Sequence, residues 1–162
     1  MNAENHLTAV AKALNQRRLE AVLIGNAAAA LQGAPVTTVD FDFFFRATPA
    51  NLRKLKLVAR DLNGHLFRPY YPVSGLYRLM NDDSGLQVDF MAVVHGVRSF
   101  AGVRSRAARL SFGGWFLRVA ALEDIIKSKR AAGRAKDRAV LEILDETSKA
   151  KATGKPSSNK GA

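Results

Sequence analysis

The segment from residue 39 to residue 45, Val-Asp-Phe-Asp-Phe-Phe-Phe, constrains the fold of this chain more than any other. Successive side chains of a β-strand point to opposite faces, so a strand here places Asp40 and Asp42 on one face and three phenylalanines on the other. Aspartate is depleted in strands, and two carboxylates on one face repel each other unless a cation lies near them. The segment therefore predicts a strand with one face in the core and one acidic face.

The acidic pair favours a magnesium site. Magnesium takes hard oxygen ligands in octahedral geometry and usually binds through one or two carboxylates, with waters and substrate phosphates completing the shell. The pattern thus indicates phosphoryl chemistry at Asp40 and Asp42. The alternative is an edge strand whose acidic face is solvated and has no chemical role.

The length and composition favour one domain. The chain has 162 residues, of which 48% are hydrophobic, and this is enough for a single core. We expect one domain over residues 1–148. From residue 149 to 162 the sequence becomes polar, basic and rich in turn formers, so we expect a disordered basic tail.

Several classes of site and location are disfavoured by the residues present. There is no cysteine, which excludes disulfides, zinc–thiolate sites and a thiol nucleophile, and three histidines make a histidine-based metal site improbable. No apolar run is long enough to span a bilayer, and the N-terminus lacks a basic region followed by an apolar one. We therefore expect a cytoplasmic protein without a membrane partner.

The positive charge is concentrated in the second half of the chain. The net charge is +11, and residues 98–138 hold 11 Lys or Arg against 3 acids, whereas residues 1–97 hold 10 against 8. This asymmetry indicates a polyanionic partner, either the phosphates of a nucleotide or a nucleic acid. Arg109 and Arg118, on predicted strands, are candidates for an exposed basic surface. The alternative is a solvated basic face that aids solubility.

Hydrophobic periodicity and turn signals give the remaining elements. A two-residue Gly-Gly signal joins the last two strands into a hairpin. The predicted helices span residues 6–17, 27–32, 49–62, 122–132 and 136–144, with a loop or short helix near 99–103. The predicted strands span residues 21–24, 39–45, 65–69, 76–80, 86–94, 107–112 and 115–119.

Two further features lie near the acidic strand. The run 21–24 ends at Gly25 and Asn26, where we expect a tight turn with Asn26 as the N-cap of a short helix that presents its N–H groups to phosphate. The strand 86–94 carries one acid, Asp89, among apolar residues. A neighbouring strand would bring Asp89 beside Asp40 and Asp42, and three acids there would fit a magnesium site.

This order of features resembles the nucleotidyltransferase superfamily that includes DNA polymerase beta and kanamycin nucleotidyltransferase. Gly25 and Asn26 stand at its Gly-Gly or Gly-Ser position, the Asp pair at its paired acids, and Asp89 at its third acid. More closely, residues 23–33, 38–42 and 122–137 look like the AbiEii-type nucleotidyltransferases of toxin–antitoxin systems.

The resemblance implies an α+β fold, a mixed β-sheet with packed helices and C-terminal helices, and transfer of a nucleoside monophosphate from an NTP such as ATP to an acceptor. It implies two magnesium ions at Asp40, Asp42 and Asp89. The catalytic residues it implies are Asp40, Asp42, Asp89 and Lys129, and the nucleotide-binding residues are Gly25, Asn26, Thr38, Lys129 and Asp137.

Three of these positions have alternative interpretations. Lys129 would offset charge on the departing pyrophosphate, or it is a surface lysine favoured by the helix dipole. Asp137 would orient Lys129, or it is the N-terminal acid of the last helix. At position 26 the family has Gly or Ser, so we expect the Asn26 amide to replace a hydroxyl as the donor to phosphate.

The sequence is compatible with two functions. The first is a magnesium-dependent nucleotidyltransferase that acts on RNA, such as a tRNA end, or on a protein, with the acceptor recognised by residues 98–138 or by a cognate antitoxin or other partner protein. The second is a catalytically weak regulatory module that keeps the fold and binds nucleotide or nucleic acid.

Overall fold

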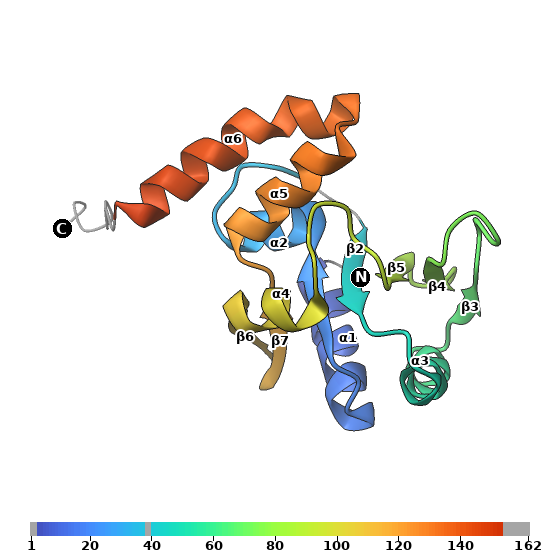
Figure 1. Ribbon diagram of the computed structural model, residues 1–162. Helices are drawn as coiled ribbons and strands as arrows, with labels where there is room; N and C mark the ends of the chain where they lie inside the picture. The colour runs from blue at the N-terminus through green and yellow to red at the C-terminus, as the bar shows by residue number, and fades with distance from the viewer. Residues whose placement is uncertain (1–2, 38–39, 154–162) are drawn as a thin grey trace.

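The fold is built on a mixed sheet of seven strands, seen in the computed structural model, which describes residues 3–37 and 40–153 (Figure 1). The order across the sheet is β3-β4-β5-β2-β1-β7-β6. The strands are β1 (Ala21–Ile24), β2 (Phe41–Phe45), β3 (His65–Phe67), β4 (Tyr77–Asn81), β5 (Leu86–Met91), β6 (Ala108–Phe112) and β7 (Trp115–Val119).

Helices cover both faces of this sheet. Figure 1 shows α2, α5 and α6 grouped at one end, with α6 lying along α5. The helices are α1 (Ala3–Arg17), α2 (Gly25–Leu31), α3 (Pro49–Asp61), α4 (Phe100–Arg106), α5 (Leu122–Ala132) and α6 (Ala135–Ala152).

The central strands set the register of the whole sheet. β1 is antiparallel to β2 and parallel to β7, and β2 is parallel to β5, so the sheet is mixed as expected. The outer pairs β3–β4, β4–β5 and β6–β7 are antiparallel. A parallel pair needs a long crossover, and here α3 with the β3–β4 segment separates β2 from β5.

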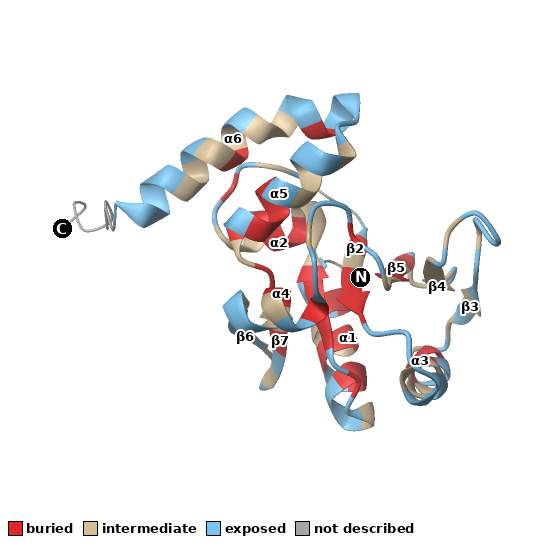
Figure 2. Cartoon of the chain, in the orientation of Figure 1, coloured by how far each residue is buried: buried red, intermediate tan, exposed pale blue. Residues whose placement is uncertain are grey.

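The phenylalanines of β2 form the centre of the core. Phe43 and Phe45 are fully buried and contact Phe90 of β5 at ring-centroid distances of 5.4 and 5.8 Å. On this face Phe41 also meets His6 of α1, at 6.5 Å. The opposite face is also covered, because Phe44 packs edge-on against Phe100 of α4. Figure 2 shows the resulting buried band through β1, β2 and α2.

The predicted elements all appear, and the bounds of several of them differ from the prediction. Asp40 precedes β2 rather than lying within it, and Val39 lies outside the described residues. β3 ends at Phe67, before the turn at residues 69–73. β5 ends at Met91, because Phe44–Met91 is its last pair with β2 and the backbone of residues 92–94 has no neighbouring strand. The expected loop or short helix near 99–103 is the helix α4.

The N-cap prediction for the second helix is wrong. α2 begins at Gly25, two residues earlier than expected, with extended Ile24 as its N-cap and no side-chain capping bond. Since the helix starts immediately after the strand, Asn26 lies inside the first turn and its side chain cannot cap it.

The predicted start of the disordered tail is also wrong. Residues 149–152 continue α6, which ends at Ala152. Lysine and alanine are strong helix formers, and lysines in the last turn interact favourably with the helix dipole. The predicted tail beyond Thr153 lies outside the described residues.

None of the helices within residues 3–37 and 40–153 has the length and apolarity that a bilayer crossing requires.

Gly96 provides a test of how tightly the loop after β5 packs on α5. Its φ is +79°, and an added Cβ would lie 2.5 Å from the Lys127 carbonyl oxygen and 2.8 Å from Ala131 Cβ. Gly85 has a similar φ of +77° and nothing within 4 Å of such a Cβ.

We predict that Gly96→Ala lowers the free energy of unfolding by roughly 2–4 kcal/mol, and Gly85→Ala by only about 1 kcal/mol, because only the first adds a backbone clash to the positive φ. Urea unfolding of both variants measures this difference. Equal losses in the two variants would contradict the packing described here.

Candidate active site

The acidic residues of β2 and β5 lie side by side in the middle of the sheet. Asp42 pairs directly with Asp89 in the parallel β2–β5 register, so both side chains are on one face. Both line a cleft of about 800 Å³ that Asp40 also lines. The structure therefore brings the three predicted carboxylates together.

The charge of Asp42 is strongly disfavoured where it lies. Burial raises the pKa of its carboxyl to about 6, with further contributions from the negative charges of Asp89 and Asp40. The charges of Lys129 and Lys136 act in the opposite direction but do not cancel this effect. A carboxylate in this position is stabilised by a cation, which is the property that a metal ligand needs.

Gly25 lies against the same carboxylate. A Cβ added at Gly25 would lie 3.1 Å from Asp42 Oδ2, and the φ of Gly25 is +72°. A larger residue would therefore be strained and would crowd Asp42. Next to it, Asn26 lines the cleft, and its Oδ1 atom is buried without a hydrogen-bond partner. The Asn26 amide thus has unused hydrogen-bonding capacity at the edge of the cleft.

The third carboxylate has an ion-pair partner that the sequence did not reveal. Arg78 of β4 is the register partner of Asp89 and donates two hydrogen bonds to it, Nε to Oδ1 at 2.8 Å and Nη2 to Oδ2 at 3.0 Å. Asp89 is buried, and this bidentate pair raises the pKa of the Arg78 guanidinium. Both oxygens of Asp89 are therefore occupied by Arg78.

Lys129 and Asp137 form the opposite wall of the cleft, on α5 and α6. Lys129 Nζ lies 3.6 Å from Asp137 Oδ1, and Arg134 Nε donates to Asp137 Oδ2 at 2.6 Å. The Arg134 backbone N–H also donates to Asp137 Oδ2, so this acid caps α6 as well. Asp137 is therefore the N-terminal acid of α6 and also the ion-pair partner of Lys129.

The pKa shifts of this pair follow from its burial. Burial lowers the pKa of the Lys129 ammonium, while the charges of Asp137 and Asp42 oppose that change. Burial alone would raise the pKa of Asp137, but the hydrogen bond and charge of Arg134 lower it, with a smaller contribution from Lys129. Lys129 has a side chain that is only 12% exposed, so it is a cleft residue rather than a surface lysine.

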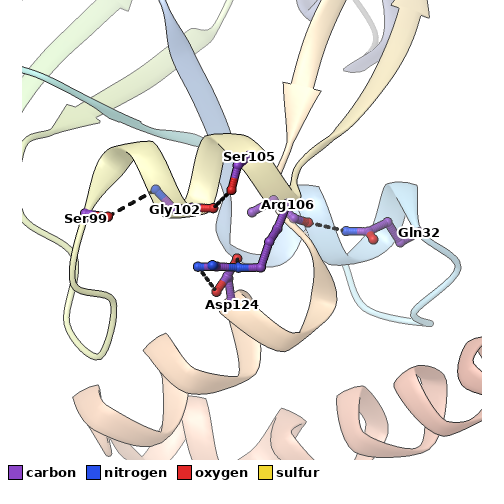
Figure 3. Close-up of polar contacts among 7 residues, drawn as sticks. Gln32, Ser99, Gly102, Ser105, Arg106 and Asp124 are labelled. Atoms are coloured by element: carbon purple, nitrogen blue, oxygen red, sulfur yellow. Dashed lines mark hydrogen bonds and ion pairs between the residues drawn. The ribbon is translucent and has the colours of Figure 1, made fainter.

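Asp124, a further buried acid, fixes the start of α5 (Figure 3). Asp124 is 2% exposed and accepts two hydrogen bonds of 2.9 Å from Arg106 of α4. Gln32, just after α2, donates to the Ala120 carbonyl at 2.6 Å. These bonds connect α2, α4 and α5, and so they hold the helix that carries Lys129 over the cleft.

The cleft therefore contains most of the predicted site residues. Gly25, Asn26, the three acids, Lys129 and Asp137 all line it or contact a residue that does. Thr38, the remaining nucleotide-binding prediction, lies outside the described residues. Within residues 3–37 and 40–153, no three His, Cys, Asp or Glu side chains have the arrangement of a metal site.

Sequence reasoning missed Arg78 and Arg134, which contact the predicted acids. A signal for Arg78 was present, because the turn-forming residues Asn-Asp-Asp-Ser-Gly at 81–85 make the flanking predicted strands a hairpin. Counting outward from the pair Asn81–Leu86 places Arg78 opposite Asp89. Arg134 had a weaker signal in its spacing of three residues from Asp137.

A family model described as "Nucleotidyl transferase of unknown function (DUF2204)" matches residues 3–155. The matched range includes both walls of the cleft. No curated protein matches the sequence.

Solved nucleotidyltransferases share the fold. The lincosamide antibiotic adenylyltransferase LnuA, in a lincomycin-bound crystal structure, is similar over 90% of this chain and 98% of its own, with a TM-score of 0.65 and 10% identity. ANT(2'')-Ia in complex with adenylyl-2''-tobramycin is similar over 87% and 86%, with a TM-score of 0.58 and 15% identity. An antigenic nucleotidyltransferase-like protein from Paracoccidioides brasiliensis is similar over 89% and 74%, with a TM-score of 0.54 and 16% identity. The predicted nucleotidyltransferase fold is confirmed.

The buried charge of Asp42 predicts how stability depends on pH in the absence of metal. Because its pKa rises from 3.8 to about 6 on folding, the native state binds the proton more tightly than the unfolded state between these values. The resulting destabilisation is fully present above about pH 6 and disappears as pH falls toward 4.

We therefore expect Asp42→Asn, in the presence of a chelator, to be more stable than the wild type by roughly 1–3 kcal/mol near pH 7, with the gain vanishing near pH 4. Urea unfolding across this pH range measures it, with the exposed Asp82→Asn as the control. A variant that is less stable near neutral pH, or a gain that does not depend on pH, would contradict the electrostatics described for Asp42.

Proposed function

The chain belongs to this family of nucleotidyl transferases and is an enzyme of that type, and we propose that it is a magnesium-dependent nucleotidyltransferase that moves a nucleoside monophosphate from an NTP to an acceptor hydroxyl. The observation that carries the proposal is the cluster of Asp40, Asp42 and Asp89 at one cleft, where burial and mutual repulsion disfavour the charge on Asp42.

The residues present fit a divalent cation at Asp40 and Asp42. Asp89 completes the set once its carboxylate is shared between Arg78 and the metal. We propose two magnesium ions held by these three acids, as the resemblance implies. When bound, they neutralise triphosphate oxygens and stabilise the attacking and leaving oxygens.

The remaining cleft residues suit the phosphates of an NTP. Gly25 allows close approach beside Asp42, and the Asn26 amide, whose Oδ1 has no hydrogen-bond partner, can turn its NH₂ group toward a phosphate oxygen. Lys129 is held by Asp137, and Lys136 lines the same wall. We propose that these two cations offset the charge of the departing pyrophosphate. Thr38 and Asp137 complete the proposed nucleotide site.

The transfer step needs no covalent enzyme intermediate. The acceptor oxygen forms a bond to the α-phosphorus, the bond between this phosphorus and the oxygen bridging to the β-phosphate breaks, and pyrophosphate leaves with that oxygen. The hydroxyl proton passes to a cleft carboxylate or to water. Positioning and charge stabilisation by the cleft then account for catalysis.

The basic half of the chain favours RNA as the acceptor over a cationic small molecule. Arg104, Arg106, Arg130 and Arg134 are used in internal ion pairs. Arg109 and Arg118 pair across the β6–β7 hairpin, and Arg109 is exposed. An AbiEii-like role in a toxin–antitoxin system, with a cognate partner protein in the cytoplasm, is part of the same proposal.

One observation favours the second function, a catalytically weak binding module. Both oxygens of Asp89 are engaged by Arg78 in the described structure, so a module that kept this pair would bind nucleotide with two metal ligands rather than three. Arg78→Met separates the two functions: it raises transfer if the pair is inhibitory and lowers transfer if Arg78 positions Asp89 for catalysis.

We predict that Asp42→Asn abolishes nucleotide transfer and weakens Mg²⁺-dependent NTP binding at least about tenfold, because it removes a ligand charge and almost no volume. A labelled-NTP transfer assay against total RNA, with calorimetric titration of NTP and Mg²⁺, measures both effects. Asp82→Asn should behave as the wild type. Wild-type transfer by Asp42→Asn would refute the proposed metal site.

We also predict that charge reversal of Arg109 and Arg118 to Glu weakens tRNA binding for all sequences and reduces its dependence on salt, since phosphate contacts release counterions. Fluorescence anisotropy at several salt concentrations measures this. NTP binding should be unchanged. Equal tRNA affinity in the two proteins would assign the basic hairpin to solubility instead.

A further inference from the structure

Exposed aromatic side chains are concentrated beside the cleft. Among the described residues, six large hydrophobic side chains are exposed, and four of them lie in the segment 67–73. Phe67, Tyr70 and Tyr71 are 41%, 52% and 63% exposed. Exposed apolar clusters on a protein surface mark interaction sites. This segment is therefore a candidate binding site.

Two arginines lie on these rings. The Arg68 guanidinium lies 4.2 Å from the Tyr71 ring centroid and 4.9 Å from that of Tyr77, and Arg78 lies 5.7 Å from that of Tyr70. We call Phe67, Arg68, Tyr70, Tyr71 and Arg78 the aromatic rim. Flat tyrosine rings combined with guanidinium planes form a surface on which unpaired nucleobases stack.

The aromatic rim is continuous with the carboxylates. Phe67 pairs with Arg78, Arg78 with Asp89, and Asp89 with Asp42, so these four side chains form one row on one face of β3, β4, β5 and β2. Three strand spacings separate the ends of this row, roughly 14 Å. Tyr70 and Arg78 themselves line the cleft. A ligand bound on the rim therefore reaches the acids directly.

We propose that the aromatic rim is the acceptor subsite and that it stacks the unpaired terminal bases of single-stranded RNA. This proposal rests on the proposed nucleotidyltransferase function. Charge supports RNA, because the aromatic rim carries Arg68 and Arg78 and has no acidic side chain of its own. The proposed phosphate site at Gly25, Asn26 and Lys129 lies toward the other end of the row, which leaves the rim to the acceptor.

The test measures RNA binding by the full chain without NTP or magnesium. Tyr70→Ala/Tyr71→Ala should weaken binding of a short single-stranded RNA by roughly tenfold or more, the loss expected when a base loses its stacking partner. Binding of a blunt RNA hairpin of the same composition should be unchanged. Tyr70→Phe/Tyr71→Phe should retain wild-type affinity, because stacking requires the ring and not the hydroxyl.

Two controls separate stacking from general effects. Val73→Ala removes an exposed side chain of the same loop that has no ring, and should bind RNA as the wild type does. Arg68→Gln should weaken single-stranded RNA several-fold, whereas Lys12→Gln on α1, across the sheet, should not. Thermal unfolding checks that each variant is folded.

The results show whether the rim binds a base of RNA or the base of the NTP. If the alanine variant loses affinity for NTP and not for RNA, the rim binds the base of the nucleotide and the RNA assignment is overturned. If both affinities are unchanged, the rim does not bind bases and a protein acceptor becomes the better explanation. If RNA binding depends on the rim but the wild type transfers no nucleotide, the proposed function is refuted. The rim then remains a binding site for single-stranded RNA.

Discussion

Repulsion among the carboxylates that line the cleft is the constraint on which the site depends. Asp42 lies between Asp89 on the neighbouring strand and Asp40 before β2, and burial raises its pKa to about 6. The fold holds these charges together through the phenylalanines on the other face of β2, which are locked into the core. The site is therefore strained in the absence of a cation, as expected where binding is favoured over stability.

The protein compensates for this acidity with cations from β4 and α5. Arg78 of β4 neutralises Asp89, while Lys129 of α5 faces the cleft and is held by Asp137 of α6. Arg134 also pairs with Asp137, so that this carboxylate is shared between Arg134 and Lys129. Because Lys129 shares its acidic partner, its ammonium group can still attract an incoming phosphate. The packing of α5 against α6 is in this way connected to the proposed chemistry.

The same sheet row joins the carboxylates of the cleft to the exposed aromatic segment. Arg78 is the shared member, since it contacts Asp89 on one side and the ring of Tyr70 on the other. Ligand binding at the aromatic rim and the ion pairing of Asp89 therefore involve the same guanidinium, that of Arg78. In the proposed function, the acceptor therefore binds on the same sheet that carries these carboxylates.

The sequence by itself predicted the strands, the helices and several of the residues that line the cleft. Alternation in residues 39–45 separated the acidic face from the apolar face, and the resemblance placed Gly25, Lys129 and Asp137 in one cleft. Only the tertiary structure decided that Asp42 and Asp89 are direct neighbours, because the parallel β2–β5 register joins strands more than 40 residues apart and no local turn fixes it. The pairing of Arg78 with Asp89 follows from the local β4–β5 hairpin, whereas only the tertiary structure decided that α2 starts at Gly25, directly after β1.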